Sequence, residues 1–136
     1  NFFFIIYPSR KSNPVFYLQY AYARICNIIK HGENNSLNLK QKYDPAILCH
    51  TDELKLLKHI VTFPELVETT SKTLEPQNIA TYLQELAALF HRFYGQCRVI
   101  SDNSKLSKAR LNLVSAVKIT LENGLKILGI SAPEKM

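Results

Sequence analysis

Residues 13–24 read NPVFYLQYAYAR, and they open a helix whose two sides differ in chemistry. Pro14 suits a first helical turn and Gly32 is a natural stop, which together predict a helix over 14–31. At about 100° per residue, one stripe of this helix is suited to a core: Leu18, Tyr22, Ile25 and Ile29. A second stripe is aromatic, polar and basic: Tyr17, Tyr20, Arg24, Asn27 and His31. The sequence therefore predicts one helix that serves both a core and a surface.

Further helices are predicted on either side of Pro64. With Thr51 as N-cap, helical spacing follows in Leu54, Leu57, Ile60 and Val61. Because Pro64 must end or kink this helix, a second piece should hold Leu66, Val67 and Leu74. Before these helices, the polar stretch 33–50 predicts a surface loop with room for a short helical turn.

The clearest apolar period begins after Glu75-Pro76. It repeats every three or four residues over about six turns, in Ile79, Leu83, Leu86, Phe90, Phe93, Cys97 and Ile100. After turn residues at 101–104, a last helix is predicted from about Lys105 to Leu128, with Gly129 at its end. We therefore expect an all-α fold, an antiparallel helical bundle in which sequential helices are neighbours.

Composition narrows the class of protein. With 136 residues and 46% hydrophobic content, the chain is long enough for one domain and too short for two. Its longest apolar run, Phe2 to Tyr7, is far below the roughly 18 residues of a membrane span, so we expect a soluble cytoplasmic protein that does not enter a membrane. Three cysteines without CxxC spacing favour reduced thiols over disulfides or a zinc site.

No motif in the chain predicts catalysis. Glycine-rich phosphate loops, the HExxH pattern and a nucleophile elbow are all missing from the sequence. The acids of Asp52-Glu53 and of Glu65 and Glu68 fit helix starts and solvated faces, and Cys49-His50 fits a loop. We therefore expect no catalytic residue, no metal and no cofactor in this chain.

The surface stripe instead favours RNA. Aromatic rings stack on unpaired bases and basic side chains hold phosphates, and the chain carries a net charge of +6. On the long helix His91, Tyr94 and Arg98 repeat this chemistry. From the residues alone the alternative stays open that Tyr17 and Tyr20 cap the core and Arg24 pairs with an acid such as Glu33. A protein-interaction or scaffold bundle and a non-specific RNA binder also remain possible readings.

Four segments, in the same order, resemble arginyl-tRNA synthetases. YLQYAYARI (17–25) resembles the first helix of their anticodon-binding domain, and LFHRFYGQCRVI (89–100) resembles its long helix. KARLNLVSAV (108–117) is similar to the signature of the wider family named for an Asp-Ala-Leu-Arg motif. NGLKILGISAPEKM (123–136) resembles the carboxy terminus of the arginyl enzymes. The resemblance covers residues 13–136.

The resemblance implies a function and a site. It implies a carboxy-terminal domain that recognises the anticodon loop of arginine tRNA, as a monomer, beside a catalytic domain absent from this chain. That catalytic domain would make the parent an ATP-dependent arginine–tRNA ligase. The residues implied at the anticodon loop are Tyr17, Tyr20, Arg24, Tyr94 and Met136, while Arg98 and Lys108 are further candidates for phosphate contacts.

Residues 1–8 resemble the last strand of the family's catalytic domain. A longer segment usually separates that strand from the Asn-Pro pair that opens the first helix, whereas here only 9–12 intervene. Either residues are missing at this junction or the protein is short there, and we favour the first reading. The expected organisation is thus a catalytic-domain remnant at 1–8 and a helical bundle at 9–136.

Overall fold

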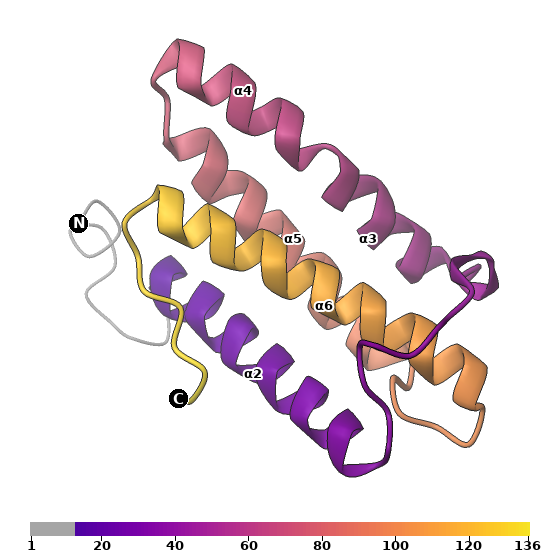
Figure 1. Cartoon of the computed structure of the whole chain (residues 1–136). Coiled ribbons are helices and arrows are strands. Elements are labelled where there is room, and N and C mark those ends of the chain that lie inside the picture. The colour runs from indigo at the N-terminus through magenta and orange to yellow at the C-terminus, as the bar shows by residue number, and fades with distance from the viewer. Residues whose placement is uncertain (1–12) are drawn as a thin grey trace.

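Helices make up all the regular structure of the described residues, 13–136, in the computed structural model. They are α2 (Pro14–Asn34), η1 (Pro45–Ile47), α3 (Thr51–Val61), α4 (Phe63–Thr73), α5 (Gln77–Gln96) and α6 (Ser104–Ile127). Successive long helices run in opposite directions, and α3 and α4 together form one broken rod (Figure 1). The predicted all-α antiparallel bundle is confirmed. The expected remnant at 1–8 lies outside the described residues.

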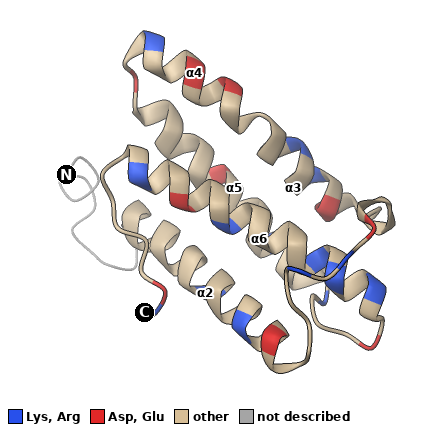
Figure 2. Ribbon diagram, in the orientation of Figure 1, with Lys and Arg blue, Asp and Glu red and all other residues tan. Residues whose placement is uncertain are grey.

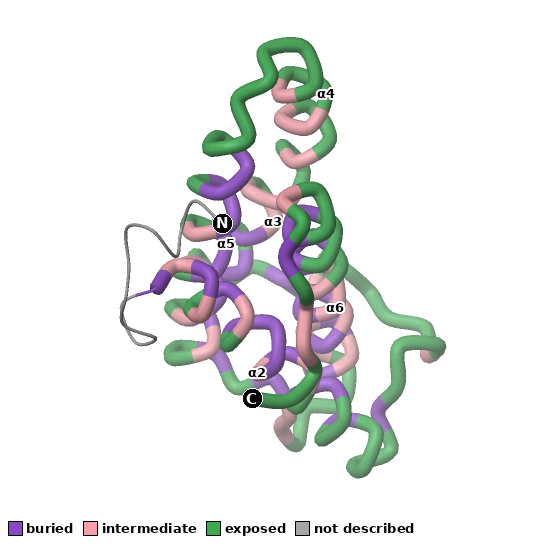
Figure 3. The backbone as a smooth tube through the Cα atoms, turned by 90° about the vertical axis from the view of Figure 1, so that its left-hand side faces the viewer, coloured by how far each residue is buried: buried purple, intermediate pink, exposed green. Residues whose placement is uncertain are grey.

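Three helices build the centre of the bundle and two cover it. The helices α2, α5 and α6 all pack against one another, α3 packs on α5 and α6, and α4 packs on α5. Figure 3 shows α4 projecting beyond the other helices, with exposed and intermediate residues along its length. Within 13–136 no helix combines the length and the apolar content needed to cross a membrane.

Side-chain caps start three of the five α-helices in the described residues. Asn13 Oδ1 accepts from the Val15 amide at 2.9 Å at the start of α2, and Asn103 caps α6 in the same way. At α3 the predicted cap is wrong by one residue, because His50 Nδ1 accepts from the Asp52 amide at 3.1 Å. Glu53 completes a capping box by accepting from the His50 amide at 3.0 Å.

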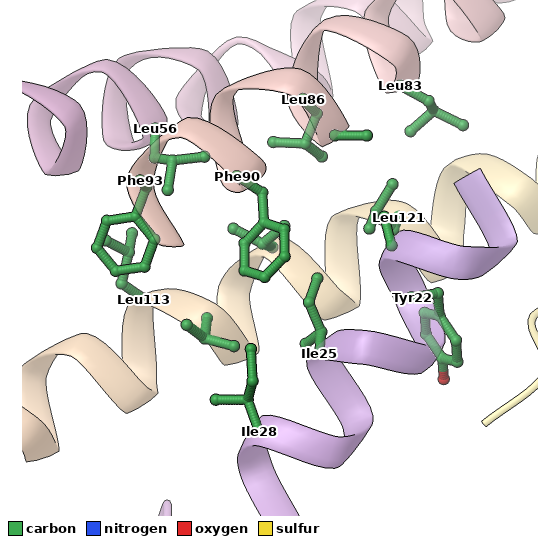
Figure 4. Close-up of a cluster of buried hydrophobic side chains, with 14 of the residues drawn as sticks. Tyr22, Ile25, Ile28, Leu56, Leu83, Leu86, Phe90, Phe93, Leu113 and Leu121 are labelled. Carbon is green, nitrogen blue, oxygen red and sulfur yellow. The ribbon is translucent and has the colours of Figure 1, made fainter. Parts of the chain in front are cut away.

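The core follows the apolar stripes predicted on α2, α5 and α6. Figure 4 shows Ile25 of α2, Phe90 and Phe93 of α5 and Leu121 of α6 pointing into the space between these helices. All four side chains have no measurable solvent exposure. The burial of four such side chains is worth about 1.5–3 kcal/mol each in apolar transfer free energy.

The predicted long helix is too long at its carboxyl end. It stops at Gln96, since Cys97 adopts extended backbone with φ −121° and ψ 126°. Cys97 and Val99 are nevertheless buried in the core. The apolar period therefore runs on into a loop, which spacing alone cannot distinguish from helix.

The face that α3 buries matches the predicted one only in part, because Leu57 and Ile60 of the predicted stripe pack against the core. Leu54 and Val61 are exposed, whereas Leu56 is fully buried. Glu53 is only 1% exposed, and its Oε2 accepts from Arg110 Nε of α6 at 2.8 Å. The expectation that this carboxylate lies on a solvated face is wrong, because the ion pair turns it toward α6.

Leu74, predicted as part of the second helical piece, lies just beyond α4. It ends that helix in a left-handed conformation with φ 58° and is 81% exposed. Leu66 and Val67 of the same piece are partly buried against the core.

Candidate nucleic-acid interface

The packing of α2 against α5 gathers the predicted aromatic side chains around His91. The Tyr17 ring centroid lies 5.6 Å from the imidazole centroid and that of Tyr20 lies 6.3 Å away. The Tyr20 and His91 planes meet at 29°, a stacked arrangement. Because the two tyrosines are one helical turn apart and both half exposed, they present adjacent ring surfaces to solvent.

Arg24 lies against the same cluster, one turn further along α2. Its guanidinium carbon is 4.5 Å from the centroid of the Tyr94 ring, and Nη1 lies 3.4 Å from Nδ1 of His91. Among the described residues Arg24 makes no ion pair. The alternative that Arg24 pairs with Glu33 is therefore wrong, and its positive charge remains available to an anion.

Burial sets the protonation of the cluster. Burial lowers the pKa of His91, and the neighbouring Arg24 charge lowers it further, so the imidazole is neutral near pH 7. A neutral His91 can accept the hydrogen bond from Arg24 through Nδ1. Burial also raises the pKa of Tyr17, which keeps its hydroxyl protonated and able to donate.

A groove continues from this cluster along the second half of α2. Its volume is about 610 Å³, and its other wall is the end of α5 with the loop that follows. The groove residues with polar or aromatic side chains include Arg24, Asn27, His31, Tyr94 and Arg98. Every residue of the predicted surface stripe on α2 thus lies either at the His91 cluster or in this groove.

The carboxyl tail crosses α2 on another side of that helix. Gln19 Nε2 donates to the Ser131 carbonyl at 3.0 Å and to its hydroxyl at 3.2 Å. This contact gives Gln19 a structural role, and Figure 1 shows the tail passing in front of α2. Met136 is 57% exposed, and no hydrogen bond or ion pair ties it to the other described residues. Its place at the site stays a prediction.

The two candidate phosphate contacts lie in different places. Arg98 is exposed in the groove beside Arg24, and its carbonyl accepts from Arg110 Nη1 at 2.9 Å. Lys108 lines a separate groove where the loop before η1 meets α6.

His91 was grouped with Tyr94 and Arg98 in the sequence, but it was not among the residues implied at the anticodon loop. Its spacing of three residues from Tyr94 on α5 was the available signal. Its central position became visible only once α2 packed on α5, because the spacing says nothing about which helix faces it.

The site offers stacking and anion binding. It contains no carboxylate next to the imidazole, and the described residues hold no cluster of His, Cys, Asp and Glu suited to a metal. Paired tyrosines, a neutral histidine and free arginines are side chains that bind unpaired nucleotides.

Fold and surface define a helical domain with an aromatic, basic face, and comparison with known proteins identifies its family. Residues 18–136 match the model of the DALR anticodon binding domain. The chain belongs to this family.

Its relatives include arginine–tRNA ligases. One from Dehalococcoides mccartyi is 48% identical over 124 residues, which covers 91% of this chain and 22% of the relative. One from Carboxydothermus hydrogenoformans is 48% identical over 126 residues, or 91% of this chain and 23% of the relative. The arginyl-tRNA synthetase of Thermus thermophilus superposes with a TM-score of 0.77 at 29% identity, over 88% of this chain and 21% of that one. The chain thus spans about a fifth of the length of these relatives.

Proposed function

We propose that this chain is the anticodon-binding domain of an arginyl-tRNA synthetase and that it recognises the anticodon loop of arginine tRNA. The observation that carries the proposal is the cluster of Tyr17, Tyr20 and Arg24 around His91, with Tyr94 against Arg24, on a domain of this family. Splayed bases would stack on the tyrosine rings, and Arg24 would bind a phosphate or a base edge with its planar fork.

The larger enzyme would supply what this chain lacks. A catalytic domain elsewhere in the polypeptide would bind ATP and arginine and attach the amino acid to the tRNA. The domain described here would hold the anticodon stem-loop so that the acceptor end reaches that catalytic domain. We further propose a cytoplasmic, monomeric protein, with Met136 at the anticodon loop and Arg98 and Lys108 on phosphates.

Competition between tRNAs tests the proposal. Labelled arginine tRNA should bind the chain, and the same tRNA with a changed anticodon should compete poorly. Binding should weaken steeply as salt rises from about 50 to 200 mM, because bound counterions are released from the RNA. If the two tRNAs competed equally well, the chain would be a non-specific RNA binder. Binding that is absent or insensitive to salt would favour a protein-interaction bundle.

Tyr20 offers a test at one side chain. Tyr20→Ala should weaken binding of arginine tRNA about 5- to 150-fold, the equivalent of about 1–3 kcal/mol for one lost base stack. Because the ring is 46% exposed, the free energy of unfolding should change little. Tyr20→Phe keeps the ring and should bind nearly as the wild type does. A large loss of stability in Tyr20→Ala would instead assign the ring to the core.

A further inference from the structure

A second basic and aromatic groove lies where the loop before η1 crosses α6. It has a volume of about 600 Å³ and is lined by Lys42, Tyr43, Asp44, Ala46, Ile47, Lys105 and Lys108. The blue segments of that loop and of the start of α6 lie close together in Figure 2. The groove thus collects lysines from two segments that are more than 60 residues apart in the sequence.

The charge of this groove is not neutralised within the domain. Among residues 13–136, no ion pair involves Lys42, Lys105 or Lys108. Asp44 is the one acid in the lining, and its Oδ1 accepts from the Ala46 amide at 3.0 Å as the cap of η1. Three lysines against one aspartate leave an excess of positive charge that attracts an anion.

The loop that carries Lys42 and Tyr43 is held in place on both sides. Before them, Gln41 Nε2 donates to the Ser36 carbonyl at 3.2 Å, and Leu37 is buried. After them, η1 packs against α6 and Leu48 is buried. The Tyr43 ring is therefore held exposed beside the lysines, ready to contact a ligand without first ordering the loop.

We infer that this groove is a second RNA contact, in which Lys42, Lys105 and Lys108 hold the phosphate backbone of the same tRNA while Tyr43 packs against a nucleotide. The inference rests on the proposed function. Lys105 follows Arg98 of the first groove by seven residues, so their Cα atoms lie within about 25 Å of each other. One stem-loop can span that distance. Lysine acts on phosphate as a point charge without reading bases, so this groove adds affinity rather than anticodon selectivity.

The test compares two triple variants of the 136-residue chain that lose the same charge. The first replaces Lys42, Lys105 and Lys108 by alanine. The control replaces three exposed lysines of α3 and α4 by alanine, namely Lys55, Lys58 and Lys72. Affinities for arginine tRNA and for its anticodon-changed form are measured over a range of salt, with unfolding curves for each variant.

The groove variant should bind arginine tRNA about 10- to 100-fold more weakly near 0.1 M salt, and its plot of log affinity against log salt should be shallower by about 2–3. The ratio of affinities for the two tRNAs should not change. The control variant should keep the wild-type slope. An unchanged slope in the groove variant, or equal losses in both variants, would overturn the inference. If the wild-type chain fails to distinguish the two tRNAs, the proposed function fails instead, and the slope difference still decides whether the groove contacts RNA.

Discussion

At the level of single residues, His91 links the two helices that form the proposed anticodon site. It contacts Tyr17 and Tyr20 from one side and accepts from Arg24 on the other. A neutral imidazole can accept the hydrogen bond from Arg24, whereas an imidazolium would repel the guanidinium. The protonation of His91 should therefore couple the stability of the domain to pH.

The pH dependence has a defined sign. The unfolded His91 titrates near pH 6.5, and the fold lowers this pKa. As the pH falls through 6.5, the unfolded chain takes up a proton that the folded chain resists, so the free energy of unfolding decreases until the pH reaches the folded pKa.

Urea unfolding between about pH 5 and 8 should show a smaller decrease in the free energy of unfolding for His91→Gln than for the wild type. His31→Gln, at the exposed end of α2, is the control and should follow the wild type. A His91→Gln profile parallel to the wild type would contradict the assignment.

At the level of elements, the packing of α6 on α5 leaves no room for a side chain at Gly124. A Cβ atom added there would lie 2.5 Å from Cδ2 and 2.7 Å from Cδ1 of Leu83, a fully buried side chain. Gly124→Ala should therefore destabilise the domain by about 1–3 kcal/mol through overpacking. Gly95 is the matched control because it also lies in a helix, yet a Cβ there meets no atom within 4 Å. Gly95→Ala should stabilise by about 0.5–1 kcal/mol. Chemical denaturation measures the free energy of unfolding of both variants. Equal changes in the two would contradict the close contact between Gly124 and Leu83.

The placement of α3 depends on one buried ion pair. Glu53 and Arg110 join α3 to α6, and Arg110 also holds the loop carbonyl of Arg98. Glu53→Ala leaves the Arg110 charge without its partner and should cost about 3–5 kcal/mol. The exposed Glu68–Lys72 pair is the comparison, and Glu68→Ala should cost no more than about 1 kcal/mol. Similar urea midpoints for the two variants would show that the buried ion pair contributes no more to the free energy of unfolding than the exposed pair does.

At the level of the whole molecule, the carboxyl tail is tied back to α2, the first described helix. Ser131 meets Gln19 across 112 positions of sequence, so the last residues are held near α2 while Met136 remains exposed. This placement allows the terminal side chain to contact RNA without serving the core.

Replacing Met136 tests that role. Met136→Ala should reduce the affinity for arginine tRNA several-fold by removing an apolar contact of about 1 kcal/mol, with the unfolding curve unchanged. Met136→Leu keeps a similar apolar side chain and should retain most of the binding. Equal affinities of the alanine variant and the wild type would remove Met136 from the site.

Much of this protein could be predicted from its sequence, because helices depend on local spacing and local caps. The apolar stripes of α2, α5 and α6, Pro14 at the first turn and the loop before η1 were all predictable on those grounds. So was the aromatic stripe of α2, since residues three and four apart share a helix face. Spacing could not place the end of α5, because Cys97 continues the apolar pattern from extended backbone.

Only the tertiary structure decided what depends on partners far along the chain. It turned Glu53 inward to meet Arg110, and it brought His91 between the tyrosines of α2 and Arg24. It also set Lys42 beside Lys105 and Lys108. The physical reason is common to all three: a periodic pattern specifies which side chains share a face, whereas the rotation and neighbours of that face follow from the packing of the whole bundle.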